Sequence, residues 1–173
     1  MNLQYRSERD KAYGLAGMTV TLVALNGEEY LRELDLDAPD ADAFVFENVY
    51  ALKANPRMSA KVVWQQTLRD LRLMTSLSLG NIHCRRVLLD SRRPDRDEMQ
   101  AVADALAADA AEHLGFDVDE AYELFNATNR YAMSLFSHDG VQAIAQAFAD
   151  RLIEQRHIAA IDAFEFLAAR GLS

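Results

Sequence analysis

The second half of the chain carries four successive blocks in which apolar residues recur every three or four positions. Spacing of this kind gathers apolar side chains on one face of an α-helix. The blocks are Met99, Val102, Ala103, Leu106, Ala110 and Leu114; Leu124, Phe125, Thr128, Ala132, Leu135 and Phe136; Val141, Ile144, Ala145, Phe148 and Leu152; and Ile161, Phe164, Leu167 and Ala168. The pattern predicts four amphipathic helices in this half.

The start of each helix is marked by an aspartate that is followed three residues later by glutamate or glutamine. In such a capping box the aspartate oxygen accepts a hydrogen bond from an unpaired backbone N–H, and the second residue bonds back. The four pairs are Asp95 with Glu98, Asp117 with Glu120, Asp139 with Gln142, and Asp162 with Glu165. Gly115 and Gly171 stand where left-handed C-terminal caps would fall.

The longest apolar run, about residues 56–89, predicts a long central helix. Asn55 and Pro56 would open it, because proline at the first helical position gives up only an N–H that would be unpaired anyway. Apolar residues lie on nearly every side of the helical wheel, which indicates a helix contacted by neighbours all round. We allow for a kink at Gly80 and Asn81.

The segment around residues 8–25 allows two interpretations. In the first, Ser7 with Asp10 caps a helix that ends at Asn26-Gly27. In the second, the β-branched run 19–23 is a strand, and Asn26-Gly27 forms the turn of a β-hairpin. We favour the helix because its apolar face extends back to residue 12.

Two further features of the N-terminal region bear on the fold. The small residues of segment 14–17, Gly-Leu-Ala-Gly, would let another helix approach closely. Alternating apolar residues near 28–50 allow two short strands. The sequence thus predicts a mainly α fold, a compact bundle of five or six helices around the central helix, with a small two-stranded β element.

The length of 173 residues suits a single domain, residues 1–173, able to bury a substantial core. Within it, residues 1–52 supply the N-terminal helix and possible strands, and 53–94 the basic central helix. Residues 95–173 supply the four amphipathic helices.

Charge is segregated along the chain. Residues 53–94 hold nine basic and two acidic residues, a net charge of +7, whereas residues 95–139 hold two basic and eleven acidic, a net charge of −9. In one interpretation the acidic helices simply pack around the basic one. In the other, five arginines form an exposed patch for an anionic partner, namely Arg85, Arg86, Arg92, Arg93 and Arg96. Nucleic acid is an unfavourable partner, because the isoelectric point is near 4.9.

The chain lacks recognisable catalytic and metal-binding patterns. Its single cysteine, Cys84, cannot form an internal disulfide, which favours a reducing, cytoplasmic location. We expect no membrane helix, because the most apolar early stretch is too short. Glu154 and His157 form one Glu-x-x-His pair, but a di-iron bundle needs two such pairs, so we expect no metal site and no cofactor. His157 is expected to end the third amphipathic helix.

These observations favour a protein-interaction or assembly module without catalytic activity, which binds a protein partner or self-associates, for example as a homodimer. Two alternatives stay open. One is a small-molecule-binding protein or enzyme with a site between helices, lined by polar groups such as His83, Asn81 or Tyr131. The other is an anion- or nucleic-acid-binding regulator that uses the arginine patch.

Overall fold

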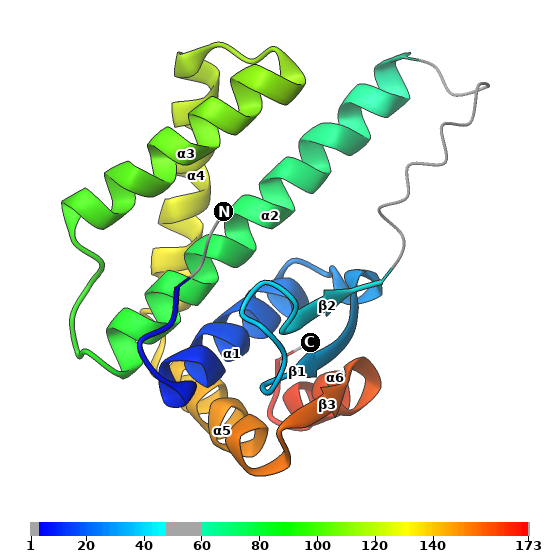
Figure 1. The fold of residues 1–173 in the computed structure, drawn as a ribbon, viewed down its shortest axis with the longest axis vertical. Coiled ribbons are helices and arrows are strands. Elements are labelled where there is room, and N and C mark those ends of the chain that lie inside the picture. Colours follow the sequence, from blue (N-terminus) through cyan, green and yellow to red (C-terminus); the bar gives the residue numbers. More distant parts are fainter. Residues whose placement is uncertain (1–3, 48–59, 173) are drawn as a thin grey trace.

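The computed structural model describes residues 4–47 and 60–172 and confirms a mainly helical fold with a small antiparallel sheet (Figure 1). The order along the chain is α1 (Glu8–Ala24), a 3-10 turn η1 (Glu28–Tyr30), β1 (Leu31–Asp35), β2 (Phe44–Phe46), α2 (Ala60–Leu88), α3 (Arg96–Leu114), α4 (Val118–Leu135), α5 (Asp139–Gln155), β3 (His157–Ala159) and α6 (Ala160–Ala168). The expected helix start at Asn55 and Pro56 lies outside the described residues.

The helical interpretation of residues 8–25 is confirmed, and the hairpin interpretation is wrong. Ser7 caps α1, its Oγ accepting a hydrogen bond from the Asp10 amide at 3.2 Å. Every residue from Asp10 to Val23 is buried. A helix enclosed on all sides can carry β-branched residues throughout, because tertiary packing outweighs their modest preference for strands. Asn26, with a positive φ of 51°, follows the helix end instead of forming a hairpin turn.

Helices α1 and α2 meet at glycines. A Cβ atom added to Gly17 would lie 2.5 Å from Cys84 Cβ and closer still to the Gly80 carbonyl oxygen. One added to Gly14 would lie 2.6 Å from Asn81 Nδ2. The backbones of α1 and α2 therefore lie so close together that only glycine fits at these positions. The small residues of segment 14–17 predicted this close approach.

The sheet has one more strand than the sequence predicted. Its order is β2-β1-β3, all antiparallel, with Leu34 of β1 opposite Phe44 on one side and Ile158 on the other. The expectation that His157 ends a helix is wrong, because α5 stops at Gln155 and His157 begins β3. Arg156, with a positive φ of 64°, redirects the chain between the two elements.

Two of the four expected capping boxes are confirmed, those of Asp95 with Glu98 in α3 and of Asp117 with Glu120 in α4. The other two are wrong. Helix α5 begins after His138 and has no side-chain cap, and α6 begins at Ala160, so that Asp162 lies inside its first turn. The left-handed conformations of Gly115 and Gly171 are confirmed by positive φ angles of 66° and 86°.

Helix α2 contributes to two cores. On one side Leu73, Leu77 and Cys84 join the larger core, which contains α1, the sheet, α5 and α6. On the other side Leu79 packs with residues of α3 and α4, including Leu106 and Phe125. The helix continues without a break through Gly80 and Asn81. Figure 1 shows its N-terminal half extending past the sheet.

Residues 73, 75–81 and 83–85 of α2 are buried, whereas residues 64–72 are exposed or partly exposed. The prediction of contacts all round therefore describes the C-terminal half of the helix. None of the described helices is long and apolar enough to cross a membrane.

Candidate functional site

The five arginines of the predicted patch lie in different environments, and Arg85 is the most enclosed. Its side chain is only 7% exposed and donates to both carboxylate oxygens of Asp10, at 2.8 and 2.5 Å. Arg6 also donates to Asp10. Burial by itself raises the pKa of Asp10, but hydrogen bonds from Arg85 and Arg6 outweigh that and hold it well below the usual range. Arg85 therefore joins α1 to α2.

Arg86 and Arg92 are bound to carboxylates at the junction of α2 and α3. Arg86 donates to Glu98 at 2.6 Å and to Asp90 at 2.9 Å, while Arg92 donates to the other oxygen of Glu98 at 3.0 Å. Partial burial opposes ionisation, but hydrogen bonds from Arg86, the Asp95 amide and Arg92 lower the pKa of Glu98 to about 2. These contacts fix the connection between the two helices.

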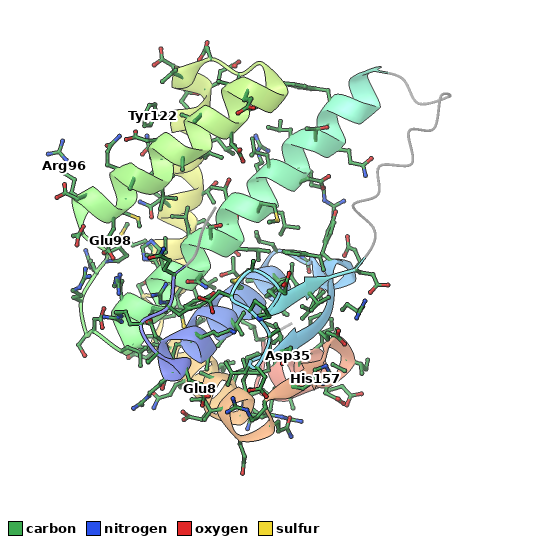
Figure 2. All side chains as sticks on the ribbon, viewed as in Figure 1. Glu8, Asp35, Arg96, Glu98, Tyr122 and His157 are labelled. Carbon is green, nitrogen blue, oxygen red and sulfur yellow. The ribbon has the colours of Figure 1, made fainter. Side chains whose placement is uncertain are left out.

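Arg93 and Arg96 are exposed, and neither forms an ion pair within the described part of the chain. Figure 2 shows Arg96 projecting outward from the start of α3. The exposed portion of the predicted patch thus consists of Arg93, Arg96 and, in part, Arg92. Binding of an anionic partner there stays a prediction.

Two of the polar residues named for a site between helices, His83 and Asn81, form hydrogen bonds with other side chains. His83 Nε2 lies 2.8 Å from Asn129 Oδ1, and burial lowers its pKa. Asn81 donates to the Tyr5 hydroxyl at 2.9 Å and accepts from Arg85. No group of three or more metal-ligating side chains occurs among residues 4–47 and 60–172.

An open groove lies along the N-terminal half of α2. It consists of two adjoining parts, of about 490 and 720 Å³, which share Leu25, Leu68, Arg72 and Ser76. The first part lies between α2 and the segment that holds Gly27 and Tyr30; the second lies between α2 and α4, with Phe116 at the start of α4. We call the two parts together the α2 groove.

The α2 side of the groove is a stripe at four-residue spacing: Trp64, Leu68, Arg72 and Ser76. At a rise of 1.5 Å per residue this stripe is about 18 Å long. Trp64 is 46% exposed and contacts Phe116, their ring centroids being 5.2 Å apart. An exposed tryptophan of this kind is typical of binding surfaces.

The α4 wall of the groove is anchored at one end and charged at the other. Tyr131 of α4 donates through its hydroxyl to the Ala24 carbonyl at the end of α1, at 3.0 Å. Glu120 closes the capping box of α4, whereas Glu123 forms no ion pair with any described residue. Arg72 on the opposite wall is likewise without an ion pair in the described ranges. The groove therefore presents one arginine, Arg72, and two carboxylates, Glu120 and Glu123, that form no ion pair with a described residue.

Sequence reasoning named Tyr131 as a possible pocket residue but did not find the groove. Trp64 and Leu68 were assigned to a helix enclosed on all sides, and the exposure of Trp64 contradicts this for the N-terminal half of α2. The available signal was the four-residue spacing of Trp64, Leu68 and Arg72, which mixes apolar and charged residues on one stripe.

Comparison with known proteins gives no match: no protein-family model matches the chain, and no curated protein or solved structure resembles it significantly.

Proposed function

We propose that this chain is a protein-interaction module that binds a polypeptide segment in the α2 groove. The observation that carries the proposal is the partly exposed stripe Trp64, Leu68 and Arg72 on α2, which borders the hollows of the α2 groove. An aromatic anchor, aliphatic neighbours and an arginine are the residue types that dominate binding energy at protein interfaces.

The shape of the groove favours a polypeptide over a small molecule. Small-ligand sites usually enclose most of the ligand surface, whereas the α2 groove is open along its length. Its length of about 18 Å matches three turns of a helix. Helix-in-groove recognition places apolar anchors along such a channel and charged residues at its edges.

The groove chemistry gives little support to catalysis. Ser76 Oγ donates to the Arg72 carbonyl at 2.8 Å, so its proton is engaged in a helix contact. The remaining polar side chains that line the described groove are arginine, glutamate, glutamine, threonine and tyrosine, without a histidine or cysteine. A nucleophile next to a general base, as covalent catalysis requires, is not formed by these residues.

The proposal is tested by placing a photo-crosslinking amino acid at position 64 in cells and identifying the adducts by mass spectrometry. The matched control carries the same residue at position 161, because Ile161 is also apolar and 64% exposed but lies on α6. We expect a discrete polypeptide adduct from position 64 that is absent from position 161. The same adduct should form when the purified chain is mixed with the purified polypeptide. Equal labelling from both positions, or none from position 64, would contradict the proposal.

A further inference from the structure

We infer that the polypeptide bound in the α2 groove is a second copy of this chain, related by a two-fold axis. The inference rests on the proposed function and names its partner. It is carried by the charges of the groove: Arg72 and Glu123 line the same hollow from opposite walls and form no ion pair with each other or with another described residue.

An occupant that removes Arg72 and Glu123 from water has to supply partners of both signs. A simple anion would satisfy Arg72 and leave Glu123 without a partner, and a cation would do the reverse. A second copy presents its own Arg72 on α2 and its own Glu123 on α4. In a two-fold interface every contact occurs twice. Arg72 of each copy would therefore pair with Glu123 of the other.

The surface around these charges has the form that helix packing requires. Leu68 and Arg72 stand on a ridge of α2 with a hollow on each side, because both residues line both parts of the groove. The ridge of one copy can therefore enter the hollow between α2 and α4 of the other. The result is a four-helix arrangement made of α2 and α4 from each copy.

Two exposed aromatic residues lie where this arrangement would cover them. Trp64 and Tyr131, which are 46% and 37% exposed, both line the hollow between α2 and α4. Since the contact is only about 18 Å long, it is small for a protein interface, and we expect a weak dimer whose population depends on concentration.

The test is sedimentation equilibrium of the purified full chain over a concentration series, at low and at high salt. We expect a monomer–dimer equilibrium that shifts toward monomer at high salt, because exposed ion pairs are screened. The variants R72E and E123R should each raise the dimer dissociation constant about tenfold or more, since each reversal turns two symmetry-related attractions into repulsions.

Reciprocity distinguishes this interface from a general charge effect. The R72E chain carries acidic groups on both walls and the E123R chain basic groups on both, so an equimolar mixture should form a heterodimer more readily than either variant forms a homodimer. The double variant R72E/E123R should regain the homodimer. The matched controls R93E and E165R alter exposed charges outside the groove and should leave the equilibrium unchanged.

Three results would overturn the inference: a monomer at every concentration, a dimer that R72E and E123R do not weaken, or equal weakening by R93E and E165R. Circular dichroism of each variant checks that the fold is retained. If the chain is monomeric while position 64 crosslinks a different polypeptide, the second copy is refuted and the proposed function stands. If position 64 also gives no specific adduct, both fail.

Discussion

The close approach of α1 and α2 predicts that Gly17→Ala destabilises the fold strongly. The added Cβ would lie 2.5 Å from Cys84 Cβ and closer to the Gly80 carbonyl oxygen. Carbon atoms are normally at least about 3.5 Å apart. Both obstacles belong to, or are attached directly to, the α2 backbone, so no flexible side chain can move aside. The two helices must separate by roughly 1 Å, and α1 is buried on every side.

The magnitude follows from two opposing contributions. Overpacking of a tight core typically costs about 1–3 kcal/mol, and a contact against the backbone should cost at least about 3 kcal/mol. Replacing glycine by alanine inside a helix recovers about 1 kcal/mol. We therefore expect a net loss of about 2 kcal/mol or more in the free energy of unfolding.

Gly140→Ala is the matched control. Gly140 lies in the first turn of α5, and a Cβ there meets nothing within 4 Å. The same chemical change should leave stability unchanged or raise it by up to about 1 kcal/mol. Urea unfolding followed by circular dichroism measures both variants. If Gly17→Ala unfolds at the same urea concentration as Gly140→Ala, the close approach of the helices is wrong.

Three further predictions concern buried polar groups. Asp10→Asn should lower the free energy of unfolding by about 3–5 kcal/mol, measured by urea unfolding, because it leaves the buried Arg85 without its counter-charge. The folded-state pKa values of Asp10 and Glu98 are lowered, that of Glu98 to about 2. The contribution of these two carboxylates to the free energy of unfolding is therefore complete above about pH 5 and is lost as the pH falls. Urea unfolding at several pH values should show stability declining below pH 5, and the decline should be less steep in Asp10→Asn. Cys84 is buried, and burial raises the pKa of its thiol. A thiol reagent at pH 8 should therefore label the chain only after unfolding. Rapid labelling of the native protein would contradict the packing of α1 on α2.

The sequence predicted those helix starts that depend only on residues next to them in the chain. The boxes of Asp95 and Asp117 are confirmed because each aspartate lies immediately before a helix that starts there. The boxes of Asp139 and Asp162 were wrong because the spacing alone does not say where the preceding chain turns. The start of α6 depends on β3, which pairs with β1 more than 120 residues away, Glu33 lying opposite Ala159. A strand of three residues carries no periodicity that could reveal it.

The candidate site was less predictable because it depends on burial and on distant partners. Clustering of arginines in sequence suggested one patch, yet Arg85 points inward to Asp10, which lies 75 residues earlier. Arg86 binds Glu98 of the following helix. Nothing in the spacing of arginines distinguishes the inward from the outward ones. The α2 groove was equally hidden, because it is formed between α2 and two elements that are distant in sequence.

The placement of charge along α2 divides the helix into two parts with different roles. In the C-terminal half, Arg85 and Arg86 are each bound to carboxylates, and the surrounding apolar side chains belong to both cores. In the N-terminal half, Arg72 has no described carboxylate partner, and Trp64 faces solvent. Substitutions at Arg85 should therefore alter the free energy of unfolding. Substitutions at Arg72 should leave it within about 0.5 kcal/mol, as is usual for surface positions, and alter binding alone. Substitutions at Trp64 should also lose the ring contact with Phe116, worth about 0.5–1.5 kcal/mol. A helix that is fixed at one end by internal ion pairs can thus present its other end as a rigid, preorganised surface, which reduces the entropic cost of binding.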